Sequence, residues 1–535
     1  MKKLLMIVLA VLPLLLNAQT MQPLNAKTKQ PAIKPFSADE VKEQKGIAEA
    51  AYKALNFGDA LKIYERLVVT DPRNADYNYK LGLCYMITNI NKAKAVPYLE
   101  YAANANDKDK PKDVTFDLGR SYFYAGLYDK ALDTYEKYRV EKHNSIDSKL
   151  KFDTWVDWAV SAKKITATPV DVTFNNMGKG INSNGVDYRP LMGIADTIVY
   201  FNSKRKGNTG GLVDDLGEIP SDIYFWLQND SSVSKAKNGG ININTPYYED
   251  ALYLSPNGDR MIMYMEGPES NGDLHIVKQA GKSWEKPVIL GKDFATKSLE
   301  TGATMSPDGL TLYFSAEAEG SKTGKDIYVC TRTESTSWSK PERLGDNINT
   351  KGDEDAPVMW IDGKTLFFSS TGHGSIGGYD LFKVTMKDPR EGFNKPENLG
   401  YPINTLYDDL GIALKADGKS GYLAQVRDSG MGDYDIYEFD LQKPLVDQTL
   451  TWIEGRTFSL VGTAAKGAFV SITDAATGTS FGTIETNDAT GRFDIALPPG
   501  TYKVVAKHPK LGMCNADIAV GAGEYKQVLD MKFPN

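Results

Sequence analysis

The stretch SPDGLTLYFSAEAEGSKTGKDIY at residues 306–328 is the clearest copy of a unit that recurs along the chain. Each copy joins a tight turn, an aromatic strand and a second strand that opens with Asp. The turn glycines of four copies lie 51, 54 and 55 residues apart: Gly258, Gly309, Gly363 and Gly418. A fifth, earlier copy keeps the aromatic strand at 199–201 without the glycine. Self-similarity at a period near 50, with about four short strands per unit, predicts a β-propeller.

The ends of the repeated region indicate how such a ring would close. Most copies finish with an Ile-Asn-Thr segment, as at 348–350. Residues 170–177 resemble this closing strand although no copy precedes them, and the last copy ends near Phe439 without one. Joining the two removes both exposed sheet edges. The sequence therefore predicts a five-bladed propeller over 170–442, closed by the strand at 170–177.

Residues 38–167 have a helical period instead. Gly82 and Gly119 each precede a tyrosine by three residues, and the alanines of the expected second helices, Ala60, Ala95 and Ala131, lie 35 and 36 residues apart. This spacing is typical of tetratricopeptide repeats, in which small residues let paired helices approach closely. We expect an α-helical solenoid of three repeats, with a solvated cap helix over residues 146–165.

The last 85 residues or so alternate again with period two. Strands are expected at 453–460, 468–473, 491–497, 502–506 and 516–520, separated by Gly- and Pro-containing turns. The region 450–535 is therefore predicted to be a small antiparallel β-sandwich. The chain as a whole is expected to be a multidomain protein.

The N-terminus and the overall charge limit where the protein works and what it binds. Residues 1–18 combine Lys2-Lys3, an apolar run and a small-residue end, which predicts a secretory signal peptide, and 19–37 read as a flexible leader. No later segment has about 20 apolar residues, so no transmembrane segment is expected in the mature chain. Removing the two lysines takes the formal charge from −7 to −9, which argues against a nucleic-acid partner. We expect an exported, periplasmic protein.

Two of the regions resemble known families. The unit at 306–328 looks like the PD40 repeat, a TolB-type relative of WD40. Residues 455–505, with Gly491-Arg492-Phe493 and a Pro-Pro-Gly turn at 498–500, resemble a carboxypeptidase regulatory-like domain. The order of signal peptide, tetratricopeptide repeats, propeller and sandwich is similar to that of PorE-like periplasmic proteins of the type IX secretion system.

This resemblance implies that the protein associates peripherally with the outer membrane and that its partners are envelope proteins such as type IX secretion components. Relatives of this kind typically continue into an OmpA-like domain that binds peptidoglycan, whereas this sequence reaches Asn535 without one, and no Cys for lipid attachment follows the apolar run. We therefore expect that another protein holds this one at the envelope, or that its role has shifted from that of the family.

One acidic position recurs in all five copies. It lies nine residues before the turn glycine, near the start of the innermost strand, and comprises Asp187, Glu249, Glu300, Glu354 and Asp409. One interpretation is an acidic ring at a mouth of the channel that attracts cations or basic peptides. The alternative is that each acid accepts backbone N–H bonds and fixes its turn. The aspartates that open the second strands could likewise bind a cation or cap a turn, and turn capping is favoured over calcium binding. These aspartates are Asp222, Asp273, Asp326, Asp380 and Asp435.

The sequence offers no catalytic site, cofactor site or metal site. The four histidines are spread over three domains, and no zinc or phosphate-loop motif occurs. The better candidate surface is the tetratricopeptide groove, because such solenoids bind peptides along a concave face. Its expected lining residues are Asn78, Tyr85, Arg120, Tyr124 and Tyr128, and exposed tyrosines such as Tyr247 and Tyr407 could serve a second partner on the propeller.

The leading hypothesis is thus a non-enzymatic scaffold with three binding modules in series. The alternative is an envelope protein that binds peptidoglycan or another glycan.

Overall fold

The computed structural model describes residues 33–534. The gaps within this range are 107, 143–144, 148–150, 196, 214–216, 230–231, 268–269, 282, 292–299, 319–320, 322, 333–336, 389–391, 447–449, 488–489 and 522–525. The expected signal peptide and most of the expected leader lie outside the described residues.

The N-terminal domain is helical, and consecutive helices pack against one another. A Cβ at Gly82 would lie 2.6 Å from Leu99 Cγ, and one at Gly119 would lie 2.5 Å from Tyr135 Cε1. These glycines therefore allow the close approach on which the repeat prediction depended. The helices are α1 (Ala38–Lys53), α2 (Phe57–Thr70), α3 (Ala75–Ile87), η1 (Lys92–Ala95), α4 (Val96–Ala103), α5 (Val114–Tyr124), α6 (Tyr128–Glu141) and α7 (Phe152–Ile165).

Two expectations for this domain need correction. The end of the leader is not free, because Phe36 is buried against α2 with its ring beneath the Arg66 guanidinium. Helix α7, expected to be a solvated cap, instead faces the β region: Trp158 Nε1 donates to Thr371 O at 3.1 Å. The aromatic face of α7, which the sequence suggested would cap the repeats, therefore contacts the next domain.

Five small antiparallel sheets follow, named sheets I to V in chain order. Sheet I contains β2 (Asp187–Met192), β3 (Ile198–Ser203), β4 (Asp222–Asn229), β5 (Ser232–Val233) and β6 (Lys237–Asn238), with η3 (Thr209–Gly211) in its β3–β4 loop. Sheet II contains β7 (Glu249–Leu254), β8 (Arg260–Gly267), β9 (Ser270–Ala280), β10 (Ser283–Trp284) and β11 (Val288–Ile289). Sheet III contains β12 (Glu300–Met305), β13 (Thr311–Ala316), β14 (Asp326–Thr331) and β15 (Glu342–Arg343). Sheet IV contains β16 (Glu354–Met359), β17 (Thr365–Ser370), β18 (Asp380–Asp388), β19 (Gly392–Phe393) and β20 (Glu397–Asn398). Sheet V contains β21 (Ala413–Leu414), β22 (Ser420–Gln425), β23 (Asp435–Leu441) and β1 (Val172–Asn176).

The sheets surround a channel as in a propeller. The first strands β2, β7, β12 and β16 contact one another in succession, and β2 also contacts β21 and β22. Strand β1, which comes before all the others, pairs with β23 from Val172↔Leu441 to Asn176↔Tyr437. The first and last parts of the β region are therefore hydrogen-bonded together, which leaves no open edge between them.

The repeated turn glycines have a specific conformational role. Gly258, Gly309, Gly363 and Gly418 have φ between 66° and 74°, in the left-handed region that L side chains rarely adopt. The preceding Asn or Asp side chains accept backbone N–H bonds across the turn, as at Leu310 N to Asp308 Oδ1 (3.0 Å). Each turn thus joins the first two strands of its sheet.

The C-terminal domain consists of two packed sheets that share one core. One contains β27 (Arg492–Leu497), β24 (Thr451–Phe458) and β30 (Lys526–Lys532), and the other β26 (Ser480–Glu485), β25 (Phe469–Asp474), β28 (Gly500–His508) and β29 (Gly512–Val520). Strands β26 and β30 were not expected from the sequence. Because β30 runs parallel to β24, the domain is also not wholly antiparallel.

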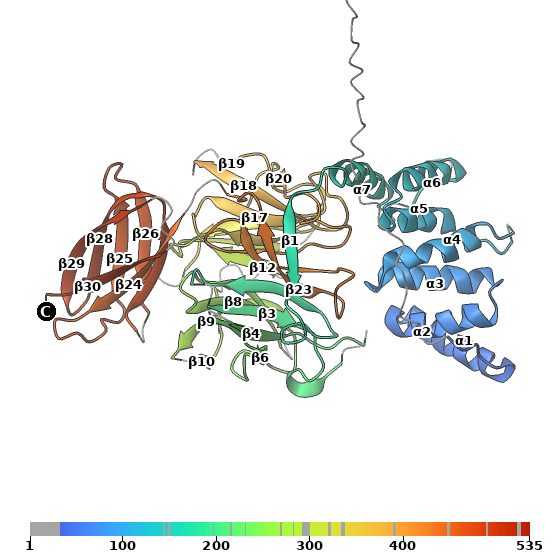
Figure 1. Ribbon diagram of the computed structural model, residues 1–535, viewed down its shortest axis with the longest axis horizontal. Helices are drawn as coiled ribbons and strands as arrows, with labels where there is room; N and C mark the ends of the chain where they lie inside the picture. Colours follow the sequence, from blue (N-terminus) through green and yellow to red (C-terminus); the bar gives the residue numbers. More distant parts are fainter. Residues whose placement is uncertain are drawn as a thin grey trace, which may run out of the picture.

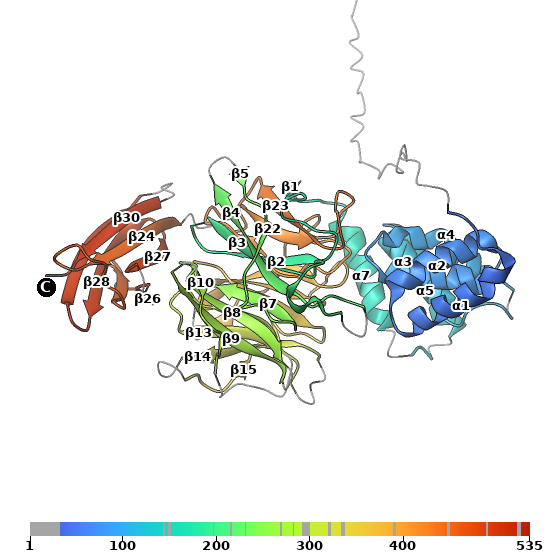
Figure 2. The same cartoon turned by 90° about the horizontal axis from the view of Figure 1, so that it is seen from below.

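The two smaller domains lie at opposite ends of the channel region (Figures 1 and 2). The helical domain contacts the loops near the starts of the innermost strands, for example through Asn89 Nδ2 to Asp433 Oδ1 (2.6 Å). The sandwich contacts the glycine turns at the other end, where Arg260 Nη2 lies 2.7 Å from Glu485 Oε2. The chain is therefore a three-part body with the sheets in the middle.

Candidate functional site

The five recurring acids lie at or just before the innermost strands, as the alignment of the copies requires. Asp187, Glu249, Glu300 and Glu354 open β2, β7, β12 and β16, and Asp409 precedes β21. All five side chains are at most 2 % exposed. They do not present an open ring of charge to solvent, so the geometry favours the turn-fixing interpretation over a cation port.

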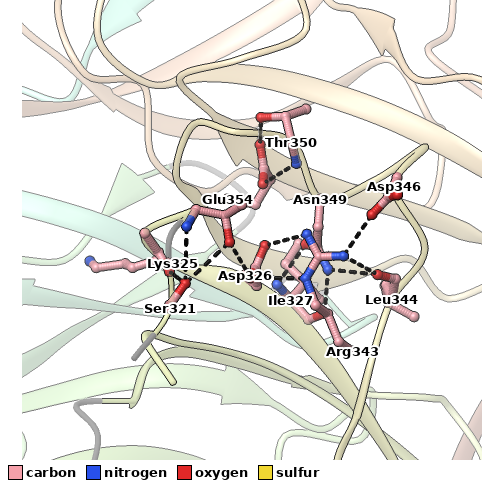
Figure 3. Close-up of polar contacts among 12 residues, drawn as sticks. Ser321, Lys325, Asp326, Ile327, Arg343, Leu344, Asp346, Asn349, Thr350 and Glu354 are labelled. Carbon is pink, nitrogen blue, oxygen red and sulfur yellow. Dashed lines mark hydrogen bonds and ion pairs between the residues drawn. The ribbon is translucent and has the colours of Figure 1, made fainter. Parts of the chain in front are cut away.

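The acids are held by the segment just before them. In Figure 3, Glu354 accepts from Thr350 N at 2.7 Å and from the Thr350 hydroxyl at 2.7 Å. The same four-residue loop recurs at the positions of Thr245, Thr405 and Ser183, whose backbone N–H groups donate to Glu249, Asp409 and Asp187. Residues 292–299, before Glu300, are outside the described residues.

The asparagine of the Ile-Asn-Thr segment also has a defined hydrogen-bonding role. Asn349 Oδ1 accepts from Ile327 N at 2.8 Å, and its Nδ2 donates to Ile327 O at 2.9 Å. The amide thus substitutes for a neighbouring strand residue. The same pair of bonds is made by Asn182, Asn244 and Asn404.

Four of the inner acids are adjacent to the strand-opening aspartate of the preceding sheet. The link is a backbone bond from the acid's own N–H to the carbonyl just before that aspartate. It joins Glu249 to Ser221 (3.1 Å), Glu354 to Lys325 (2.9 Å), Asp409 to Tyr379 (2.6 Å) and Asp187 to Tyr434 (2.9 Å). Four interfaces between sheets therefore contain a buried carboxyl pair: Asp222–Glu249, Asp326–Glu354, Asp380–Asp409 and Asp435–Asp187.

The strand-opening aspartates also cap loops, as expected. Asp222, Asp380 and Asp435 accept from the backbone N–H groups of Thr209 (2.9 Å), Ile376 (3.0 Å) and Met431 (2.5 Å), respectively. Within the described residues no group of three or more His, Cys, Asp or Glu side chains could hold a metal ion.

The carboxyl pairs differ in their counter-charge. Arg343 binds Asp326 with two bonds, Nε to Oδ2 at 2.9 Å and Nη2 to Oδ1 at 3.0 Å (Figure 3). Arg205 Nη2 lies 2.6 Å from Asp187 Oδ1. At the position of Arg343, sheets I, IV and V have Asn238, Asn398 and Asn176, which donate to a single aspartate oxygen.

Three carboxylate oxygens are consequently unsatisfied. Oδ1 of Asp222, of Asp380 and of Asp435 is buried and has no hydrogen-bond partner in the described part of the chain. Burial raises the pKa of Glu249 to about 8, of Glu354 to about 7 and of Asp409 to about 7. These groups retain protons at pH values at which ordinary carboxyl groups are ionised.

The channel itself is apolar. The last residue of each innermost strand lines it: Met192, Leu254, Met305, Met359 and Leu414. Its cavity has a volume of about 80 Å³, well below the roughly 300–1,000 Å³ of typical small-molecule sites. The channel therefore serves as core packing between the sheets.

Two of the five predicted groove residues are structural. Asn78 is 4 % exposed and donates to Pro72 O and Asn74 O, so it fixes the start of α3. Tyr85 is also buried, and its hydroxyl donates to Glu65 within the repeat. Neither side chain is available to a peptide.

The other three groove residues lie towards the propeller. Arg120 pairs with Asp117 at 3.1 Å and stacks on Trp155. Tyr124 contacts the Tyr407 ring, with centroids 6.1 Å apart. Tyr128 packs in the cluster that also contains Ile376, Tyr401 and Leu406. This part of the groove is thus covered by the chain's own propeller, and Tyr407 is an interdomain residue rather than a free surface tyrosine.

Lys92 lies at the centre of this interface and was not singled out in the sequence. Its Nζ donates to Met86 O at 2.6 Å and lies 5.0 Å and 5.5 Å from the ring centroids of Tyr124 and Tyr407. Burial lowers the pKa of Lys92 to about 8. A single lysine in a helical segment gives no sequence signal of such a role, because its partners come from two domains.

Comparison with known proteins identifies the helical region. A tetratricopeptide-repeat family model matches residues 46–111. No curated protein matches the chain.

Solved structures give distant likenesses. A family 117 glycoside hydrolase, Zg3597 from Zobellia galactanivorans, is 12 % identical, with 52 % of this chain and 92 % of that chain covered and a TM-score of 0.36. A putative TolB from Agrobacterium tumefaciens is 12 % identical, with 62 % and 99 % covered and a TM-score of 0.30. TolB from Acinetobacter baumannii is 13 % identical, with 65 % and 67 % covered and a TM-score of 0.28.

The chain therefore has an N-terminal tetratricopeptide region followed by a large all-β region. At these TM-scores the solved structures supply no activity or ligand. No helix in the described ranges is long and apolar enough to cross a membrane.

Proposed function

We propose that this protein is a non-enzymatic scaffold of the bacterial envelope. In this proposal each of sheets I to V is one blade of a five-bladed propeller, closed by β1, and residues 450–535 form a regulatory-like sandwich. The signal peptide exports the chain to the periplasm, where it acts at the inner side of the outer membrane as a component of, or accessory to, type IX secretion.

The observation that supports a scaffold best is the placement of the three modules. The propeller is bonded to the helical domain at one end and to the sandwich at the other. Surfaces on all three modules are thereby held in a fixed order along one chain. Several weak contacts to an assembly can then act together, because binding of one module raises the effective concentration of the next.

The chemistry of the positions that recur in the repeats also supports binding rather than catalysis. The recurring acids hold loops, and the channel is lined mainly by aliphatic, Met and aromatic side chains. A hydrolase of glycans or peptides needs polar groups that converge on an open pocket.

Partner surfaces are best sought on the side of the helical repeats that the propeller leaves uncovered. The second helices α2, α4 and α6 each have an exposed apolar side chain, namely Val69 (44 % exposed), Tyr101 (40 %) and Val140 (63 %). We propose that envelope proteins bind here. The resemblance to PorE-like proteins suggests secretion components as these partners.

The test is affinity purification of the tagged mature chain from cross-linked envelopes, with and without lysozyme digestion. Stoichiometric recovery of secretion components in both samples is the expected result. Recovery of mostly muropeptides would instead favour the glycan-binding alternative. Recovery of neither would remove the proposal.

A matched pair of variants locates the contact. Val140→Glu should reduce recovery of the partner several-fold, because it places a charge in an apolar contact. Val528→Glu changes a similarly exposed valine (60 %) on the sandwich and should leave recovery unchanged. Equal recovery with both variants would show that α6 is not the binding surface.

A further inference from the structure

The helical domain docks on two loops of the propeller, residues 371–380 and 400–409. Ile376 is fully buried in a cluster with helical-domain residues such as Phe123. The Tyr407 ring contacts the Tyr124 ring at a tilt of 37°, and Thr371 O accepts from Trp158 Nε1. The two loops therefore form much of the docking surface.

One carboxyl pair fixes the shape of both loops. Asp380 Oδ2 accepts from Ile376 N at 3.0 Å, and Asp409 Oδ2 accepts from Thr405 N at 2.5 Å. The backbone bond from Asp409 N to Tyr379 O (2.6 Å) joins one loop to the other. Any change in the charge of this pair acts directly on the residues that hold the helical domain.

The pair is buried and has excess negative charge. Asp380 is 0 % exposed and Asp409 1 % exposed. Asp409 Oδ1 accepts from Gln425 Nε2 at 2.9 Å, but Asp380 Oδ1 has no partner in the described residues. Ionisable groups around the pair on the packed elements are Asp408, Tyr379, Tyr434, Arg427 and, on the helical domain, Lys92.

Arg427, the arginine of this set, does not bond either carboxylate. Arg427 Nε donates to Gln425 Oε1 at 2.7 Å, and its Nη2 donates to Pro402 O at 2.8 Å. The equivalent pair Asp326–Glu354 differs, because Arg343 donates a hydrogen bond to each oxygen of Asp326. Where the arginine is replaced by Asn398, one carboxylate oxygen is left over.

We propose that Asp380 and Asp409 share one proton at neutral pH, and that this proton latches the helical domain onto the propeller. The proton satisfies the free oxygen of Asp380 by forming an O–H···O bond between the two carboxyl groups. When it leaves, two buried like charges face each other, which a site of low polarity does not tolerate. The loops must then separate, and the docking surface is lost.

The direction of the pH effect follows from the same geometry. Burial raises the pKa of Asp380 well above its usual range and that of Asp409 to about 7, and the two titrate as a unit. The first proton leaves the pair near pH 7 and the shared one only at higher pH, so docking is complete through neutral pH and weakens as pH rises into the alkaline range. For one linked proton, the docking equilibrium changes by up to about tenfold per pH unit. Lys92 loses its charge near pH 8, and this loss also weakens docking. Its effect is exerted through the helical side of the interface, not through the carboxyl pair.

The experiment is hydrogen exchange of the full mature chain at about pH 6.5 and about pH 8.5, corrected for intrinsic exchange rates. Peptides covering 371–380 and 400–409 are compared with a reference peptide from β12 and β13. Wild type should lose protection in the two loops by about tenfold or more between these pH values, with no change in the reference peptide.

Asp380→Asn is the decisive variant. Its amide mimics the protonated acid: Oδ1 can still accept from Ile376 N, and Nδ2 can donate to Asp409. Loop protection should therefore become independent of pH. Asp326→Asn is the matched control at the arginine-compensated pair and should keep the wild-type pH response. If Asp380→Asn does not fold, Asp409→Asn tests the same bond from the other side.

Three outcomes of the pH experiment would overturn the proposal. They are protection in wild type that does not change with pH, an unchanged pH response in both the Asp380 and Asp409 variants, and a response that follows Lys92→Met instead. A change in loop protection on adding calcium or EDTA at constant pH would also overturn it, because the pair would then bind a metal ion rather than a proton.

Discussion

At Gly119 the helical domain has no room for a side chain, because a Cβ there would lie 2.5 Å from Tyr135 Cε1. We predict that Gly119→Ala lowers the free energy of unfolding by about 1–3 kcal/mol through overpacking. Gly46→Ala, in α1 with nothing within 4 Å of the added Cβ, should instead raise it by about 0.5–1 kcal/mol. Urea unfolding measures both. A similar effect of the two variants would mean that the α5–α6 contact is looser than described.

Glu249 illustrates the pH dependence of a buried acid. Its pKa of about 8 in the folded protein lies above the ordinary value of 4.5. The folded state therefore keeps a proton that the unfolded chain releases, and this contribution to stability is full below pH 4.5 and is lost as pH rises to about 8. Glu249→Gln should remove this slope, so that the variant gains on wild type with rising pH. Thermal unfolding across this range provides the check, and parallel curves would contradict the assignment.

At the scale of the element, a single amide connects each closing loop to a strand of the preceding sheet. Asn349→Ala leaves the backbone N–H of Ile327 without its acceptor and removes one of two donors to the Ile327 C=O, which still accepts from Leu344 N. This should cost about 1–3 kcal/mol. Asn347→Ala, two residues away, removes the bonds from an exposed side-chain amide to Phe393 O and Asn394 O and should cost less than about 1 kcal/mol. Chemical denaturation compares them, and equal losses would show that the motif asparagine has no special role.

At the scale of the whole molecule, Tyr407 and Tyr247 occupy equivalent positions with different surroundings. Tyr407 contacts Tyr124 and Lys92 of the helical domain, whereas Tyr247 is 36 % exposed. Tyr407→Ala should weaken docking, and we expect a larger radius of gyration by small-angle scattering and faster proteolysis between α7 and β1. Tyr247→Ala should change neither property. An unchanged radius for Tyr407→Ala would show that the remaining contacts suffice.

Local patterns predicted much of the architecture. The turn glycines, aromatic strands and Ile-Asn-Thr segments placed the strands of the sheets, because each encodes a bond or backbone conformation within a few residues. The closing strand was expected at 170–177, and β1 (Val172–Asn176) lies within this range and pairs with β23. Strands β26 and β30 were missed. In β30 the burial alternates, but Val528 lies on the exposed side, so the alternation of apolar and polar residues in the sequence is weak.

Local sequence patterns predicted only part of the candidate site. The sequence places an acid at one position in each copy and an aspartate at another, but it does not show that the two meet across an interface between sheets. It also could not show that Tyr124 and Tyr128 of the expected peptide groove face the propeller. Both facts depend on contacts between separate folded segments, 27 to 29 residues apart for three of the carboxyl pairs and hundreds of residues apart for Tyr124 and Tyr407. No local periodicity exists for such contacts.

By itself, then, the sequence determined the kinds of module and their order, because helix and strand periods, turn glycines and repeat spacing are short-range properties of the chain. The tertiary structure alone decided which polar groups are buried together and which surfaces remain free. Burial removes water from the carboxyl pairs and so sets their protonation. Docking of the helical domain covers part of its own groove, and this follows from the shapes of two folded surfaces rather than from any one segment.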